Sequence, residues 1–190
     1  MRALSLPRAR WRLFAFLATL ALAAGVLVAT MANAEAEVGV TARPNFRMPF
    51  ICGQTWTGNN WRGHDPPHSI DWNHYNASGA PDDFGRRVVA SAGGKVLASY
   101  YSTATGYGHT IVIGHGGYWR TRYAHLSDRM VSKGATVSKG QVIGKVGKSS
   151  AKYNLSPHLH YEQKHDGNVV VSVVEGVRWY DYLKRKQKAC

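Results

Sequence analysis

Two runs of strand-forming residues flank a glycine pair near the middle of the chain: RVVAS at 87–91, then Gly93 and Gly94, then KVLASYY at 95–101. β-Branched and aromatic residues favour strands, and the glycines permit a tight turn between them. Further short runs follow, separated by clusters of Gly, Asn, Asp and Ser; they cover residues 110–113, 119–124, 141–146 and 158–164. This pattern predicts an all-β fold, an antiparallel sandwich or barrel.

Helical periodicity is nearly absent from the chain. The one candidate helix is short and covers residues 177–184, near the C-terminus. Residues 131–140 contain Val-Ser-Lys-Gly twice, and we interpret this echo as two glycine turns around a short strand, because two copies are too few for a solenoid. Residues 46–190 have the size of one domain.

The first 34 residues have the pattern of a secretory signal peptide. Four arginines precede an apolar run that begins at Leu13 and ends at about Thr30, and small residues follow up to Ala34. This arrangement predicts cleavage after Ala34 and export. The apolar run is a little short for a spanning helix, so we expect no stable membrane anchor after cleavage. Residues 35–45 lack periodicity and are expected to form a flexible lead-in to a domain at 46–190.

The chain is strongly basic, with a net charge of +13. The four arginines of residues 1–34 account for +4, so the remainder carries +9. An exported protein of that charge attracts anionic polymers. Anionic wall polymers of bacteria and nucleic acid both qualify as partners by charge; because no nucleic-acid-binding motif is apparent, we expect no nucleic acid. We also expect a monomer.

Two cysteines occur, Cys52 and Cys190. In an exported protein such a pair predicts a disulfide, which here ties the start of the domain to the last residue. A loop of that length gives an entropic stabilisation of about 4 kcal/mol or more in the chain-entropy account. The alternatives are two free thiols and pairing between chains.

The sequence His158-Leu159-His160 lies in the last of the predicted strands named above. Side chains alternate between the two faces of a strand, so the histidines share a face with Glu162, whereas Leu159 and Tyr161 point into the core. One imidazole can then bind a metal while its neighbour transfers a proton. Glu162 is either a group that supports this site or an exposed residue at a strand end.

More candidate metal ligands lie upstream, in GHDPPHSIDWNH at 63–74. A catalytic zinc site needs three protein ligands and an open position for water, and both imidazole nitrogen and carboxylate oxygen suit the ion. Pro66 and Pro67 stiffen a loop here, and Asp71 lies at the start of a strand. From these residues alone, a polar surface loop is the alternative.

Three motifs in order give the chain a specific resemblance: the 63–74 stretch, YAHL at 123–126 and PHLHYE at 157–162. Together they resemble the lysostaphin-type zinc metallopeptidases, LytM-like peptidoglycan hydrolases that include the β-lytic and the staphylococcal glycylglycine endopeptidases. The resemblance runs from about Phe46 to about Gly167. It implies an antiparallel β fold with a groove over the sheet, one Zn²⁺ ion and a peptidoglycan peptide as substrate.

The resemblance also implies roles for individual residues. Asp71 and His160 are implied as zinc ligands, together with one upstream histidine. His125 and His158 are implied to flank the attacking water. The other histidines outside the 63–74 ligand candidates are expected to have no catalytic role; they are His74, His109, His115 and His165.

The identity of the first zinc ligand depends on a loop length. Many members place this ligand four residues before the aspartate, where this chain has Pro67. Some secreted members have a longer loop, and the run from His64 resembles that actinobacterial type. We therefore predict His64 as the first ligand, with His68 as the alternative. A second departure, residues 149–156 in place of the family's glycine-rich stretch, affects the expected shape of the cleft.

The predicted function is a secreted zinc-dependent endopeptidase that hydrolyses peptide bonds of peptidoglycan, in the cross-bridge or the stem peptide. Zinc lowers the pKa of a bound water, and His125 or His158 would accept its proton. One alternative is a catalytically weak or inactive wall-binding or regulatory module of the same fold. Another is a basic nucleic-acid binder, which leaves the histidine motifs unexplained.

Overall fold

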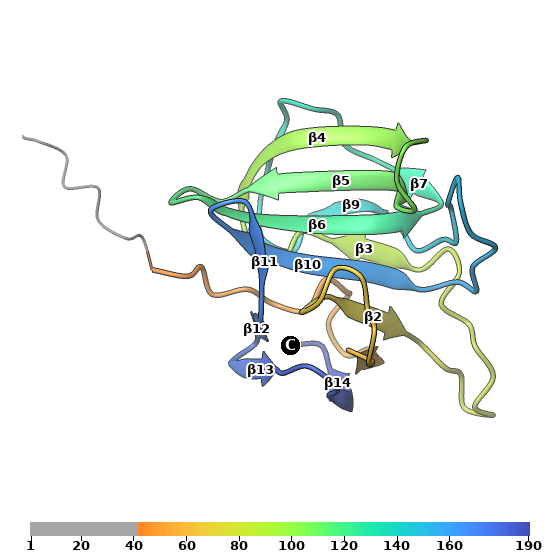
Figure 1. The fold of residues 1–190 in the computed structure, drawn as a ribbon. Helices are drawn as coiled ribbons and strands as arrows, with labels where there is room; N and C mark the ends of the chain where they lie inside the picture. The colour runs from red at the N-terminus through yellow and green to blue at the C-terminus, as the bar shows by residue number, and fades with distance from the viewer. Residues whose placement is uncertain (1–41) are drawn as a thin grey trace, which may run out of the picture. The chain divides into compact units, whose positions relative to one another are not determined.

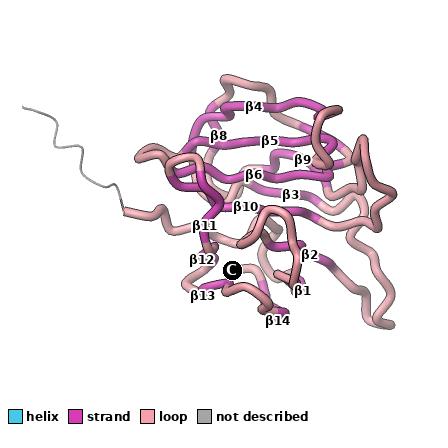
Figure 2. The backbone as a smooth tube through the Cα atoms, in the orientation of Figure 1, coloured by secondary structure: helices cyan, strands magenta, loops and turns pink. Residues whose placement is uncertain are grey.

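The computed structural model describes residues 42–190, so the predicted signal peptide and most of the predicted lead-in lie outside the described residues. The described chain consists of strands and loops, with no helix (Figure 2). The strands are β1 (Thr55–Asn59), β2 (Ile70–Asn73), β3 (Arg87–Val89), β4 (Gly94–Ser102), β5 (Gly108–Gly114), β6 (Trp119–Leu126), β7 (Asp128–Arg129), β8 (Thr136–Val137), β9 (Val142–Lys145), β10 (Leu159–His165), β11 (Asn168–Val170), β12 (Ser172–Val174), β13 (Val177–Trp179) and β14 (Lys184–Lys188).

Most strands belong to one sheet (Figure 1). Its strand order is β14-β1-β2-β10-β6-β5-β4-β8, and β11 pairs with β10. The pairings are antiparallel. A second sheet has the order β3-β9-β7, and β12 pairs with β13. The predicted antiparallel all-β fold is confirmed.

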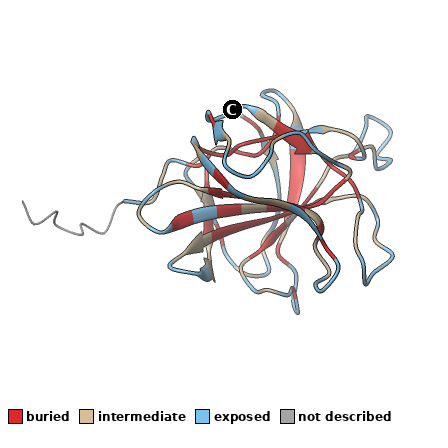
Figure 3. Ribbon diagram, turned by 90° about the horizontal axis from the view of Figure 1, so that it is seen from above, coloured by how far each residue is buried: buried red, intermediate tan, exposed pale blue. Residues whose placement is uncertain are grey.

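The hydrophobic core joins the main sheet to the smaller one. Ile111 of β5 and Tyr161 of β10 are fully buried in the same cluster as Val88 of β3 and Ile143 of β9. Buried segments recur at intervals along the long strands (Figure 3), as the two-residue period of a strand requires. Each large apolar side chain buried in this way stabilises the fold by about 1.5–3 kcal/mol. One face of the main sheet is thereby committed to the core.

The predicted C-terminal helix over 177–184 is wrong, because β13 and the start of β14 occupy its place. Trp179 is fully buried, and its ring packs edge-on against Trp72 with centroids 4.7 Å apart. Gly58 leaves the space that this indole fills, since a Cβ there would overlap the ring. Burial of the indole outweighs a weak helical pattern. Within residues 42–190 no helix is long and apolar enough to cross a membrane.

The end of the chain is fastened to the start of the domain. Cys52 forms a disulfide with Cys190, across a sequence separation of 138. Next to it, the Gly53 amide donates to the Ala189 carbonyl at 2.9 Å, and the Ala189 amide donates to the Gln54 carbonyl at 2.8 Å. Covalent and backbone bonds therefore both hold β14 against β1, at the edge of the main sheet.

The register across the sheet positions the polar site. Asn59 of β1 is opposite Asp71 of β2, and Asp71 is opposite His160 of β10. Directly opposed residues of antiparallel strands share a face. The next residues along, Trp72 and Leu159, are fully buried on the core side. Asp71 and His160 therefore project together from the other face.

Candidate metal centre and catalytic histidines

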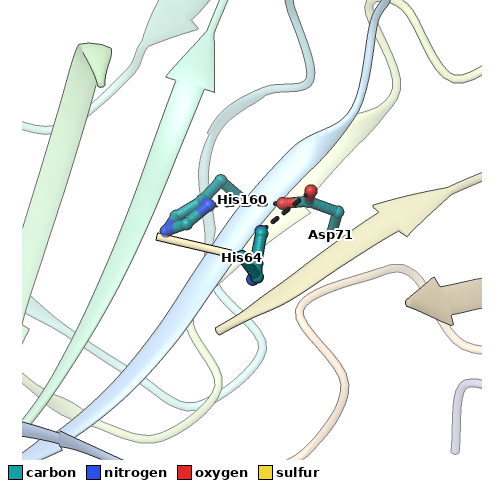
Figure 4. Close-up of side chains that lie close together, drawn as sticks. All are labelled: His64, Asp71 and His160. Atoms are coloured by element: carbon teal, nitrogen blue, oxygen red, sulfur yellow. Dashed lines mark hydrogen bonds and ion pairs between the residues drawn. The ribbon is translucent and has the colours of Figure 1, made fainter. Parts of the chain in front are cut away.

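The fold brings His160 together with His64 and Asp71, which precede it by about 90 residues. Asp71 and His160 come from the paired strands β2 and β10, and His64 comes from the loop between β1 and β2. One nitrogen or oxygen from each residue lies within 4.8 Å of the other two, and the three side chains point toward one another (Figure 4). Both histidines are buried, with 8% and 3% of their surface exposed.

The His64 ring is oriented by a backbone carbonyl. Its Nδ1 lies 3.1 Å from the Ser69 carbonyl oxygen, which can only accept, so Nδ1 carries a proton and donates it. Its Nε2 faces Oδ2 of Asp71 at 2.9 Å. Two lone pairs at that distance would repel each other. A proton or a metal cation is therefore required between Nε2 and the carboxylate.

Asp71 is the anionic centre of the site. Its Oδ1 lies 3.2 Å from His160 Nδ1, and its Oδ2 accepts a bond of 3.4 Å from the Trp61 indole. Burial alone would raise the pKa of the Asp71 carboxyl, but the hydrogen bonds from His160 and His64 outweigh burial and hold this pKa well below its usual range. Asp71 is thus a carboxylate whose charge must be neutralised by neighbouring positive charge.

His160 has the opposite ring orientation to His64. Its Nδ1 faces Asp71, and its Nε2 lies 3.1 Å from Oε1 of Glu162. Burial lowers the pKa of the ring, but the bonds to Asp71 and Glu162 have the larger, opposite effect and raise this pKa to about 9. Because carboxylates flank both nitrogens, the metal-free ring is an imidazolium. When His160 keeps the proton on Nε2 and donates it to Glu162, Nδ1 is the atom free to bind a metal.

Glu162 is fully buried, which answers the question that the sequence left open about it. The Tyr107 hydroxyl donates to its Oε1 at 2.6 Å, and the Arg122 guanidinium lies 3.4 Å from its Oε2. Burial would raise its pKa, but the contacts with His160 and Arg122 lower it to about 2. An ionised Glu162 therefore fixes the ring of His160, as a carboxylate behind a metal-binding histidine does.

The chemistry of these donors fits a zinc ion. Two imidazole nitrogens and one carboxylate oxygen converge, which is the mixed set of three ligands typical of catalytic zinc. Both histidine–Asp71 contacts need positive charge between nitrogen and oxygen. A divalent cation supplies that charge and replaces the protons. His64, Asp71 and His160 are thus the residues that would hold it.

His125 and His158 lie beside this group. The ring centroid of His125 lies 4.7 Å from that of His158 and 5.7 Å from that of His160. Each ring donates from Nδ1 to a serine carbonyl, His125 to Ser149 at 3.0 Å and His158 to Ser156 at 2.8 Å. In both rings Nδ1 is thus occupied by a backbone acceptor and Nε2 is the nitrogen left for the site; Nε2 of His158 lies 3.7 Å from Oδ1 of Asp71.

The backbone of His125 is held in an uncommon conformation. Its φ is 59°, a left-handed value that is rare outside glycine. Its amide donates to Tyr107 and its carbonyl accepts from Ser149. A Cβ on Gly147 would overlap the backbone of residues 125–127, so glycine at this position allows the Ser149 loop its close approach. These contacts aim the imidazole at the site.

The charge state of His125 suits a proton acceptor. Burial, and then the neighbouring His158 and His160, lower the pKa of its ring to about 4. A neutral ring with a fixed Nδ1–H presents a basic Nε2. This is the form that a general base requires.

His68, the alternative first ligand, is placed differently. Its Nδ1 lies 2.8 Å from Oδ1 of Asp181, and it is not part of the three-residue group. The remaining histidines have structural contacts: His74 with Asp82, His109 with Arg129, His115 with Gly93 and Thr121, and His165 with the Trp119 ring.

A cleft of about 330 Å³ opens beside the histidines. His125, His160 and Tyr107 line one part of it, and the Lys152–Tyr153 segment lines another. This segment belongs to the 149–156 loop, where the sequence departs from the resembled family. A Cβ on Gly106 would overlap the Tyr153 ring, so glycine lets this wall close on the cleft.

The sequence motifs did not identify several residues that shape the site. The carbonyls of Ser69, Ser149 and Ser156 orient three rings, but a backbone carbonyl has no sequence signature. Tyr107 reaches Glu162 across 55 residues of sequence, through a contact that only the fold creates. Trp61 lies outside the three motifs, although its indole donates to Asp71.

Comparison with known families assigns the chain. The sequence model of Peptidase family M23 matches residues 78–172, half of the chain. The protein therefore belongs to Peptidase family M23, and the resemblance inferred from its motifs is confirmed. The matched range contains His125, His158 and His160, whereas His64 and Asp71 precede it.

Individual relatives agree with this assignment. The peptidoglycan DD-endopeptidase ShyA of Vibrio cholerae is 38% identical over 82 residues, 43% of this chain and 19% of that protein. Lysostaphin of Staphylococcus staphylolyticus is 35% identical over 81 residues, 43% of this chain and 16% of that protein. The match thus spans about a fifth of the length of these curated relatives.

Solved structures share the fold. A zinc-containing peptidase from Vibrio cholerae superposes with a TM-score of 0.51 at 26% identity, over 66% of this chain and 38% of that one. Lysostaphin from Staphylococcus simulans gives a TM-score of 0.52 at 24% identity, over 66% of this chain and 48% of that one. The second likeness concerns the fold alone.

Proposed function

We propose that this protein is an exported zinc-dependent endopeptidase that hydrolyses peptide bonds of bacterial peptidoglycan. One observation carries the proposal: three side chains able to bind a metal lie together with the rings of two further histidines, and a cleft lined by His125 and His160 opens beside them. The membership in a peptidase family supports hydrolysis, and the likeness to the peptidoglycan DD-endopeptidase ShyA supports peptidoglycan as the substrate.

His64, Asp71 and His160 are the proposed zinc ligands. When bound, Zn²⁺ lowers the pKa of a water molecule and polarises a carbonyl group. Glu162 and the Ser69 carbonyl hold the two ligand rings in the orientation that points one nitrogen at the centre. Such supporting contacts typically change metal affinity or activity about 10–100-fold.

His125 and His158 are the proposed proton-transfer groups. Each has Nδ1 held by a backbone carbonyl, so Nε2 is the nitrogen that would accept a proton from the attacking water. The same ring, once protonated, can stabilise a developing oxyanion or protonate the leaving amine. The cleft that His125 lines gives the peptide a place beside both rings.

A paired substitution tests the ligand assignment. His64→Ala should abolish zinc binding, because it removes a nitrogen 2.9 Å from Asp71, whereas His68→Ala should retain zinc, because this ring contacts Asp181 instead. Zinc content of each purified variant is the measurement. Zinc retained by His64→Ala and lost by His68→Ala would transfer the ligand role to His68.

Hydrolysis of purified peptidoglycan separates the enzyme from a wall-binding module of the same fold. The enzyme releases new amino groups from the wall, and chelation stops the release. A module binds the wall without releasing them. The proposal requires that the wild-type protein generates new amino groups in the wall and that the His158→Ala variant does not.

A further inference from the structure

The edge strand β14 is a concentrated source of positive charge. It contains Lys184, Arg185, Lys186 and Lys188 within five residues, and all four are exposed. In the described part of the chain none of the four forms an ion pair with an acid. Lys184, Lys186 and Lys188, here called the lysine row, alternate along the strand and so share one face.

Each member of the lysine row is opposite a neutral polar residue of β1. The pairs are Lys188 with Thr55, Lys186 with Thr57 and Lys184 with Asn59. Successive pairs recur about every 6.8 Å along the strands. Within residues 42–190 the two threonine hydroxyls have no hydrogen-bond partner. The edge thus repeats one unit, an ammonium beside a neutral hydrogen-bonding side chain.

A hollow of about 520 Å³ lies over this part of the sheet. Thr55 and Thr57 line it together with Lys184, Arg185 and Lys186 and the loop at 75–79, and no acidic residue does. Lys188 continues the row beyond the hollow. The acid that contacts β14 is Glu175, which accepts from the side chain of Gln187. Gln187 alternates with the lysines and belongs to the other face.

The lysine row shares its face with the candidate active site. Lys184 is opposite Asn59, Asn59 is opposite Asp71, and Asp71 is opposite His160. Directly opposed residues lie on the same face. Three strand spacings separate β14 from β10, so Lys184 and His160 are about 14 Å apart at the backbone. A polymer bound along β14 would lie next to the cleft.

We propose that the lysine row and its hollow bind a linear phosphodiester polymer of the bacterial cell wall. A repeated binding unit fits a repeated anion better than a single one. Each phosphodiester offers one oxygen to an ammonium and another to the threonine hydroxyl or asparagine amide opposite it, and lysine binds phosphate as a point charge. The charged phosphates of such a polymer belong to its backbone, so they recur at a regular spacing. The lysines of the row also recur at a regular spacing.

Protection of a sheet edge is the simpler explanation for lysines on an edge strand. It accounts for exposed positive charge, but it does not require unpartnered hydroxyls opposite the lysines or a hollow free of acids. Those two features are what a ligand site adds. The proposal is independent of the peptidase activity, because the polymer contains no peptide bond.

Binding of deacylated poly(glycerol phosphate) to the full mature protein tests the proposal. We expect the triple variant Lys184→Gln, Lys186→Gln, Lys188→Gln to bind roughly 100-fold more weakly at low salt, taking about fivefold for each cation near an anionic surface. The slope of log affinity against log salt should fall by about 2, the value for three lost contacts on a single strand. Lys186→Gln alone should weaken binding about fivefold.

A matched variant removes the same charge elsewhere: Arg87→Gln, Lys95→Gln, Lys133→Gln, at three exposed positions. It should bind almost as tightly as the wild type. Equal weakening in both triple variants would overturn the proposal, because net charge alone would then explain binding. Tighter binding to polyglutamate or to single-stranded oligothymidylate would also overturn it, in favour of a carboxylate polymer or nucleic acid. A melting curve checks each fold, and Lys186→Gln decides the matter if the triple variant unfolds.

Discussion

Replacement of Glu162 by glutamine should weaken zinc binding without touching a proposed ligand. The wild-type carboxylate accepts from His160 Nε2 at 3.1 Å and from the Tyr107 hydroxyl at 2.6 Å, and it lies 3.4 Å from Arg122. Glutamine keeps the shape but loses the charge that holds Nε2–H and leaves Nδ1 for the metal. Loss of such a contact typically weakens metal affinity 10–100-fold, or about 1.4–2.7 kcal/mol.

The same substitution should also lower stability. Glu162 is fully buried, and its loss leaves the Arg122 guanidinium without a charged partner. Hydrogen bonds to a charged group contribute about 1.5–3 kcal/mol, and loss of that amount corresponds to a fall in Tm of roughly 3–12 °C for a domain of this size. Thermal melts of the metal-free variant measure this change separately from zinc binding.

Zinc affinity is measured by competition with a chromophoric chelator. The matched control is Glu175→Gln, which makes the same chemical change at a carboxylate that accepts from the Met48 and Cys190 amides. Glu175→Gln should leave zinc affinity unchanged. Wild-type zinc affinity in Glu162→Gln would refute the argument, and so would an equal loss in both variants.

Two further predictions concern catalysis and stability. His125→Ala and His158→Ala should each retain zinc while kcat falls about 10²–10⁴-fold, because the proposed role of these rings is proton transfer and not metal binding. Zinc content and wall hydrolysis measured on one sample check this, and loss of zinc from either variant would make that histidine a ligand. Replacement of both Cys52 and Cys190 by serine should lower the free energy of unfolding by roughly 2–5 kcal/mol and leave zinc binding intact. Denaturant unfolding and zinc titration measure the two effects, and an unchanged midpoint of denaturant unfolding would contradict the expectation.

The central strands could be predicted because their sequence pattern matches their environment. β4, β5, β6 and β10 alternate or are richly β-branched, and each fell within or around a predicted run. β14 was missed because KRKQK has no apolar residue to mark a strand. It is a strand because it pairs with β1 and because the disulfide and backbone bonds hold its end.

The side chains of the candidate site could be named from three motifs, but their orientation could not. Whether a histidine presents Nδ1 or Nε2 depends on which acceptor faces the other nitrogen. For His64, His125 and His158 that acceptor is a serine carbonyl, placed by loop geometry. For His160 it is Glu162, whose burial follows from the packing of Tyr107 and Arg122 around it. These contacts join segments that sequence spacing does not relate.

The central claim is that one zinc ion, held by His64, Asp71 and His160, is required for hydrolysis of peptidoglycan. The most direct measurement follows two quantities on the mature protein: zinc content per chain and amino groups released from purified peptidoglycan. Both are measured before chelation, after chelation and after zinc is returned. The account predicts one zinc per chain, loss of both zinc and release on chelation, and recovery of both with zinc. Full release by the metal-free protein would contradict it.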